Sequence, residues 1–217
     1  MPTDRRRLIW VPIIHTEVDL GRMREQVKAA HVRRLGRAKW EKRVREVDRL
    51  WDAIRARIES LRLDWSRVRL YQDGLPVCGQ EERIVADMAR AGSRNHGLLT
   101  ELMQRGATLM GTESPDLLLE EYTLARRTVS EQQAAGEGQA GEAQTGGEAA
   151  TGRQQADRHR RLLQRRDAYI ARRIDETLRP GETGLLFLGM LHGAVNHLPP
   201  DIEVSRLRPD RGADEPS

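Results

Sequence analysis

Residues 183–197 read TGLLFLGMLHGAVNH, and this stretch decides the fold. Residues 185–188 form a wholly apolar run with glycine on either side, the pattern of a strand buried on both faces of a parallel sheet. The run ends close to a polar residue, His192. Because ligands of open α/β sheets bind beside the carboxyl ends of the strands, we expect His192 to lie in a site.

Three other apolar runs end in polar residues in the same way, at residues 9–14, 68–71 and 107–110. The polar residues that follow them are His15 and Glu17, then Asp73, then Glu113. A last short strand is expected at 202–204. The pattern predicts one α/β domain over residues 1–217, with a mostly parallel sheet of about four to five strands flanked by helices.

The apolar spacing and the charge of residues 22–62 predict a long basic helical arm. Apolar residues recur at steps of three and four from Val44 to Leu61, and the segment holds fourteen Arg or Lys against six Asp or Glu. A helix of this length would span about 60 Å, so we expect a break near Gly36, which makes a helical pair. A solvated helix face is the ordinary interpretation. Nucleic-acid binding and homo-oligomerisation through this arm are the alternatives.

Residues 131–156 predict a flexible, disordered insertion. They consist only of Ala, Gly, Gln, Glu, Thr and one Arg, and such a segment has no large apolar side chain to bury. Residues 208–217 predict a disordered polar tail.

Composition limits the class of protein further. The longest apolar runs are far shorter than the roughly 20 residues that cross a bilayer, so we expect no membrane segment. Cys78 is the only cysteine, which excludes an intrachain disulfide and favours a cytoplasmic protein.

Several candidate residues also have a purely structural interpretation. Asp73 precedes Gly74 and suits a tight turn, and Ser114 with Pro115 suits the start of a helix. His96 lies in the first turn of a predicted helix and is a secondary candidate. The cap does not require Glu113, which makes it the preferred acid of the site.

Two segments resemble a known family. Residues 166–171 read RDAYIA and residues 184–192 read GLLFLGMLH. They resemble the Arg-Asn/Asp helix and the Gly-x-x-His strand end of the TraB/Tiki and erythromycin-esterase-like superfamily. The resemblance implies an α/β fold with a polar site at the strand ends, often metal-dependent or hydrolytic, in which His15 and Glu17 would take part. The chain has Ile13-Ile14 where a Gly-Thr pair is typical of that group.

Together these features predict a hydrolase-like protein that acts on a small molecule or a peptide. His15 and His192 would bind a divalent metal, for which zinc, manganese and iron are candidates. Glu17 and Glu113 would be catalytic, and Arg166 would neutralise an anionic group of the substrate. Without a metal, a buried glutamate would act as general base and a histidine as acid. The competing hypothesis is a binding or scaffold module whose polar groups only satisfy one another.

Overall fold

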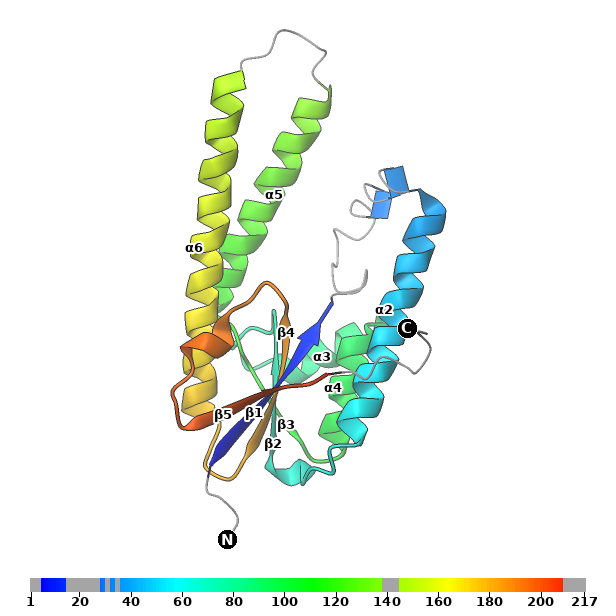
Figure 1. Cartoon of the computed structure of the whole chain (residues 1–217), viewed down its shortest axis with the longest axis vertical. Coiled ribbons are helices and arrows are strands. Elements are labelled where there is room, and N and C mark those ends of the chain that lie inside the picture. Colours follow the sequence, from blue (N-terminus) through cyan, green and yellow to red (C-terminus); the bar gives the residue numbers. More distant parts are fainter. Residues whose placement is uncertain (1–4, 15–27, 30–31, 34–35, 138–144, 209–217) are drawn as a thin grey trace, which may run out of the picture.

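A computed structural model describes residues 5–14, 28–29, 32–33, 36–137 and 145–208, with residues 128–137 and 145–151 described through their backbone alone. The strands are β1 (Arg6–Ile13), β2 (Val68–Gln72), β3 (Thr108–Met110), β4 (Thr183–Gly189) and β5 (Ile202–Arg206). They form one sheet of order β3-β2-β4-β1-β5, and all its strand pairs are parallel (Figure 1). The predicted α/β fold is therefore confirmed.

Strand β4 lies at the centre of the sheet, between β2 and β1. Its four apolar residues, Leu185 to Leu188, have no exposed surface. Leu185 and Phe187 belong to the core on one face, and Leu186 and Leu188 belong to the core on the other. A fully buried side chain of this size contributes about 1.5–3 kcal/mol, and β4 supplies two such side chains to each layer.

Helices cover both faces of the sheet. Helices α2 (Arg37–Glu59), α3 (Glu81–Arg90) and α4 (Arg94–Gln104) contribute to the first core. Helix α6 (Thr145–Thr177) contributes Ile170 and Ile174 to the second. Two 3-10 turns complete the described elements, η2 (Trp65–Arg67) and η3 (Ala194–His197).

Pro12 lies in a strand with neighbours on both sides, although proline favours edges because it has no N–H to donate. Strand β1 pairs with β4 as far as Ile13, but its register with β5 ends at Trp10. At Pro12 the strand is therefore paired only with β4, and locally it is an edge.

Helix boundaries follow from the local sequence. Ser93 caps α4 by accepting a hydrogen bond from the backbone of His96, and Gly92 before it has a φ of 94°. Helix α5 (Pro115–Glu137) begins at the predicted proline, with Ser114 Oγ accepting from the Leu117 amide at 3.4 Å. A side-chain cap followed by proline satisfies or removes the unpaired amides of a first turn.

The basic segment contains a break where the sequence predicts one. Helix α2 begins directly after Gly36, whose φ of 82° strongly favours glycine. Trp51, Ile54 and Ile58 on its apolar face are buried in the first core. Residues 22–27, the start of the predicted arm, lie outside the described residues.

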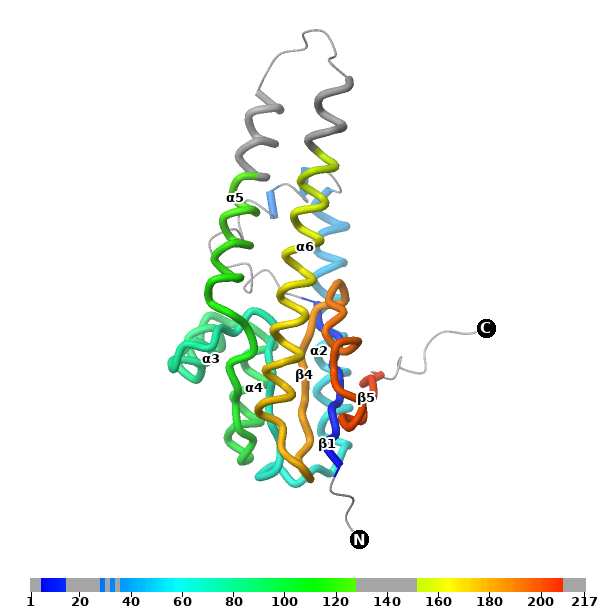
Figure 2. The backbone as a smooth tube through the Cα atoms, turned by 90° about the vertical axis from the view of Figure 1, so that its left-hand side faces the viewer, coloured from blue at the N-terminus to red at the C-terminus, as the bar shows by residue number. Residues whose placement is uncertain are grey.

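Helices α5 and α6 lie side by side and extend beyond the carboxyl end of the sheet (Figures 1 and 2). We call this pair the hairpin arm. The backbone is helical over 131–137 and 145–156, where the sequence predicts an insertion, and Ala, Gln and Glu in this stretch are tolerated well in helices. Residues 138–144 and the tail at 209–217 lie outside the described residues. No helix in the described ranges is long and apolar enough to span a membrane.

Candidate functional site

Five polar side chains from four parts of the chain meet at the carboxyl edge of the sheet. Asp73 follows β2, Glu113 follows β3, Arg166 and Asp167 lie on α6, and His192 follows β4. We call these five residues the site cluster. Their side chains are at most 7 % exposed, so their mutual contacts decide their charge states.

Arg166 and Glu113 form the centre of the cluster. Arg166 Nε donates to Glu113 Oε2 at 2.6 Å, and Arg166 Nη2 donates to Glu113 Oε1 at 2.7 Å. Nη2 also reaches Asp73 Oδ1 at 3.1 Å, and Nη1 pairs with Glu121. A guanidinium that binds a carboxylate through two parallel hydrogen bonds is among the strongest charge-assisted contacts in proteins. All three guanidinium nitrogens of Arg166 therefore contact carboxylates.

The tight turn after β2 connects three strands at this edge. The Leu75 amide donates to the carbonyl of Gln72 at 3.2 Å, and Gly74 in the turn has a φ of 77°. The Gly74 amide donates to Glu113 Oε1 at 2.8 Å, and Asp73 Oδ2 accepts from the Gly189 amide at 3.0 Å. The Asp-Gly turn that the sequence predicts is confirmed, and the same aspartate also belongs to the site cluster.

Gly111 determines how closely β3 approaches that turn. A Cβ at this position would lie 2.8 Å from Val77 Cα and 3.1 Å from the carbonyl oxygen of Pro76. Beyond it, the Val77 amide donates to the Glu113 carbonyl at 2.9 Å, and Pro76 forms a parallel bridge with Glu113. The glycine thus allows the backbone contacts that place the Glu113 carboxylate within hydrogen-bond distance of the Arg166 guanidinium.

His192 is oriented by the neighbour of Arg166. Its Nδ1 lies 2.6 Å from Asp167 Oδ1, and the other oxygen of Asp167 accepts from the Gly193 amide at 2.9 Å. The second ring nitrogen, Nε2, lies 3.5 Å from Asp73 Oδ1. A carboxylate that accepts from Nδ1 leaves Nε2 available for proton transfer.

The pKa values in the site cluster reflect burial and the three carboxylates of Asp73, Glu113 and Asp167. Burial lowers the pKa of His192, but the hydrogen bond to Asp167 and the charge of Asp73 outweigh it, and the pKa is raised overall. Burial also lowers the pKa of Arg166, and the contacts with Glu113 more than compensate. Burial raises the pKa of Glu113, while the two hydrogen bonds from Arg166 oppose that change. We conclude that Arg166 is a permanent cation and that His192 binds its proton more tightly than a free histidine.

The structure brings together three of the five residues that the sequence predicts for the site: Glu113, Arg166 and His192. His15 and Glu17 lie outside the described residues, so their predicted roles stay predictions. Asp167 is a member that sequence reasoning did not select. Its signal was its place as the acidic partner in the Arg-Asn/Asp helix that residues 166–171 resemble. It was passed over because residues adjacent on a helix normally point in different directions.

The secondary candidate His96 lies elsewhere. Its Nδ1 is 2.7 Å from the Ser93 hydroxyl at the start of α4, a helix that packs on the opposite face of the sheet from α6. Asn95 beside it donates from Nδ2 to Gln72 Oε1 at 2.7 Å, and Gln72 Nε2 donates to the Asp73 carbonyl at 2.8 Å. These contacts link α4 to the end of β2, although Asn95 Oδ1 is buried without a hydrogen-bond partner among the described residues.

The polar atoms of the site cluster are largely occupied by one another. Arg166 contacts both oxygens of Glu113 and one of Asp73, and His192 Nδ1 is bonded to Asp167. Within the part of the chain that the structure describes, no group of three or more His, Cys, Asp or Glu is arranged to hold a metal. The described side chains thus form no complete ligand set. The predicted zinc, manganese or iron depends on His15 and Glu17.

Comparisons with protein-family models, with curated proteins and with solved structures find no match for this chain.

Proposed function

We propose that this chain is a hydrolase-like enzyme in which His192 acts as general acid and base. The observation that carries the proposal is the 2.6 Å contact between Asp167 and His192 Nδ1, at the edge of a parallel sheet where α/β proteins place their ligands. The substrate would be a small molecule or a peptide that enters beside β2 and β4.

In this proposal Nε2 of His192 accepts a proton from an attacking water and returns it to the leaving group. Asp167 fixes the ring orientation, and the nearby carboxylate of Asp73, 3.5 Å from Nε2, stabilises the imidazolium that forms. Glu113 and Arg166 are positioning residues, because their polar atoms contact one another and the β2 turn. This role for Arg166 differs from the substrate contact that the sequence suggests.

A panel of chromogenic substrates tests the proposal. We would assay p-nitrophenyl acetate, p-nitrophenyl phosphate and an amino-acid p-nitroanilide, after chelation and again with added zinc, manganese or iron. Loss of a general acid–base group lowers rates by typically 10²–10⁴-fold. We expect His192→Ala to lose at least about a hundredfold on whichever substrate the wild type hydrolyses.

The control is His159→Ala, since His159 lies on the exposed face of α6 and its Nδ1 lies 3.0 Å from the Gln155 carbonyl oxygen of the same helix. It should keep wild-type rates. Equal rates for His192→Ala and the wild type would contradict the proposal. If metal supplements restore activity only to the wild type, the metal-assisted form of the proposal gains support.

The second candidate is a binding module, and one observation favours it. The loop that holds His192 also exposes two large apolar side chains, Leu191 at 88 % and Met190 at 60 %. Exposed apolar residues beside a satisfied polar cluster suit contact with a partner. The absence of hydrolysis across the whole panel, with and without metals, would favour this alternative.

A further inference from the structure

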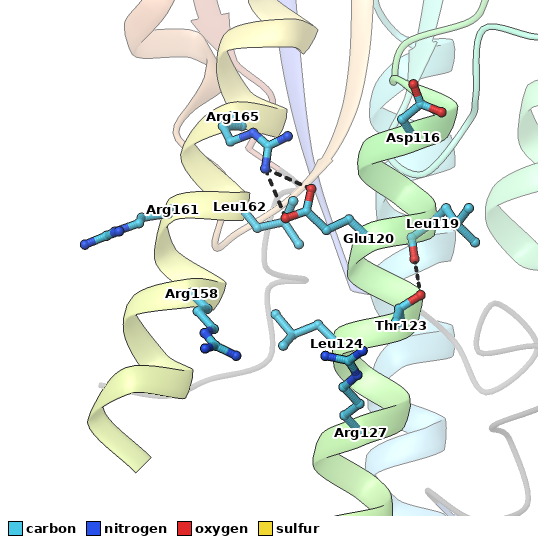
Figure 3. Close-up of a pocket in the computed structure, with 10 residues that line it drawn as sticks. All are labelled: Asp116, Leu119, Glu120, Thr123, Leu124, Arg127, Arg158, Arg161, Leu162 and Arg165. Atoms are coloured by element: carbon cyan, nitrogen blue, oxygen red, sulfur yellow. Dashed lines mark hydrogen bonds and ion pairs between the residues drawn. The ribbon is translucent and has the colours of Figure 1, made fainter. Parts of the chain in front are cut away.

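We propose that the hairpin arm binds the phosphoryl group of a small organic phosphate between α5 and α6. A pocket of about 590 Å³ lies between the two helices (Figure 3), and none of the five residues of the site cluster lines it. This volume falls within the range of about 300–1,000 Å³ that is typical of small-molecule sites. The proposal concerns binding only and is independent of the proposed enzymatic function.

The pocket carries positive charge that the described residues do not neutralise. Arg165 is paired with Glu120, at 3.0 and 2.8 Å, near the sheet end of the pocket. Arg127, Arg158 and Arg161 line the rest of it, and none of them forms an ion pair with a residue whose side chain is described. The pocket lining thus holds four arginines against two carboxylates, Asp116 and Glu120.

The two helices present these cations from opposite sides. Figure 3 shows Arg127 on α5 and Arg158 on α6 reaching into the space between the helices, while Arg161 points outward. Two guanidinium groups that face one another repel, and an anion bound between them would be attracted to both. Guanidinium groups are planar forks that match phosphate oxygens in pairs.

The wall between the charged positions is apolar. Leu162 is only 4 % exposed, and Leu124 on the facing helix is partly buried beside it. A phosphoryl group at Arg127 and Arg158 would leave the organic part of the ligand against these two leucines. A carboxylate would bring one negative charge, whereas a phosphate monoester brings about two at neutral pH, which suits this site better.

A nucleic acid fits the pocket less well than a small phosphate. Asp116 and the Glu120–Arg165 pair line the sheet end, so the basic surface does not continue along the arm in that direction. A polyanion needs a continuous basic track for its successive phosphates. A ligand with one phosphoryl end and an uncharged body needs only the observed arrangement.

Calorimetric titration with 1-naphthyl phosphate tests the proposal, in phosphate-free buffer at constant ionic strength. We expect the wild type to bind this probe at least about tenfold more tightly than 1-naphthol, which lacks the phosphoryl group, or 1-naphthoate. The variant Arg127→Gln/Arg158→Gln should lose at least about tenfold in affinity. Both positions are exposed, so the variant should keep its circular dichroism spectrum.

The matched control is Arg160→Gln/Arg172→Gln, which removes the same charge from exposed positions of α6 outside the pocket. It should bind within about twofold of the wild type. Three results would overturn the proposal: no binding of naphthyl phosphate by the wild type, equal losses in both double variants, or binding of duplex DNA in its place.

Discussion

At the scale of single residues, Arg166 makes the central contacts of the site cluster. Its buried guanidinium pairs with two buried carboxylates, Asp73 and Glu113, and with the partly exposed Glu121. Removing one partner of a buried ion pair leaves uncompensated charge and typically costs 3–5 kcal/mol. Arg166 therefore matters for the free energy of unfolding as well as for the shape of the site.

We expect Arg166→Met to lower the free energy of unfolding by about 3–5 kcal/mol at neutral pH, because Glu113 would lose both its hydrogen bonds to the guanidinium. Urea denaturation measures this change. The control Arg165→Met removes an exposed ion pair with Glu120 and should cost no more than about 1 kcal/mol. Similar losses in the two variants would contradict the electrostatic account.

His192 should make stability depend on pH in a defined direction. Its pKa is raised in the folded state by Asp167 and Asp73, against the lowering effect of burial. A group with a raised folded pKa stabilises fully below its unfolded pKa of about 6.5, and the contribution is lost as pH rises through the folded pKa.

The stability difference between the wild type and His192→Gln should therefore be larger at pH 5.5 than at pH 8.5. Urea denaturation of both proteins at the two pH values measures it, and the exposed His159→Gln serves as control. A difference that grows with increasing pH would show that burial, and not the carboxylates, dominates at His192.

The sequence identifies some residues of the site cluster and leaves others ambiguous. Glu113 and His192 could be found because each follows an apolar run that predicts a strand, and Arg166 was found through the resemblance of its helix. Asp73 was ambiguous because the Asp-Gly turn explained it locally, yet its carboxylate contacts Arg166 and the Gly189 amide. Contacts between distant segments depend on strand order, which the sequence does not state.

At the scale of elements, the end of β3 depends on one glycine. Any side chain at Gly111 would meet the backbone of Pro76 and Val77, which cannot move without displacing the Pro76–Glu113 bridge. We expect Gly111→Ala to lower the free energy of unfolding by about 1–3 kcal/mol, the usual cost of overpacking.

Gly97 is the matched control, because it lies in α4 and a Cβ there meets nothing within 4 Å. Gly97→Ala should be neutral or stabilise by up to about 1 kcal/mol, since alanine favours helix more than glycine does. Thermal unfolding of both variants measures the contrast. A Gly111→Ala protein as stable as the wild type would mean that β3 can shift freely.

Most elements were predictable because their signals are local. The apolar run of β4, the Ser93 cap of α4 and the proline that starts α5 each act within a few residues. Pro12 suits either an edge strand or a local irregularity, and at Pro12 strand β1 is paired only with β4 because β5 ends its pairing at Trp10. The length of a neighbouring strand cannot be read from the sequence around the proline.

At the scale of the whole molecule, the sheet order explains how remote residues share one site. Because β4 inserts between β2 and β1, the turn after β2 and the loop after β4 become neighbours, and α6 passes both. The predicted α/β architecture follows from the apolar runs. The meeting of Asp73 with His192 follows only from the order of the strands.

The most direct test of this account is an NMR titration of the His192 ring in the wild type, Asp73→Asn and Asp167→Asn. We predict a wild-type pKa above that of an unperturbed histidine, and a lower pKa in both variants, because each removes a carboxylate that faces the ring. A His192 pKa that is ordinary in the wild type and unchanged in both variants would contradict the shared site.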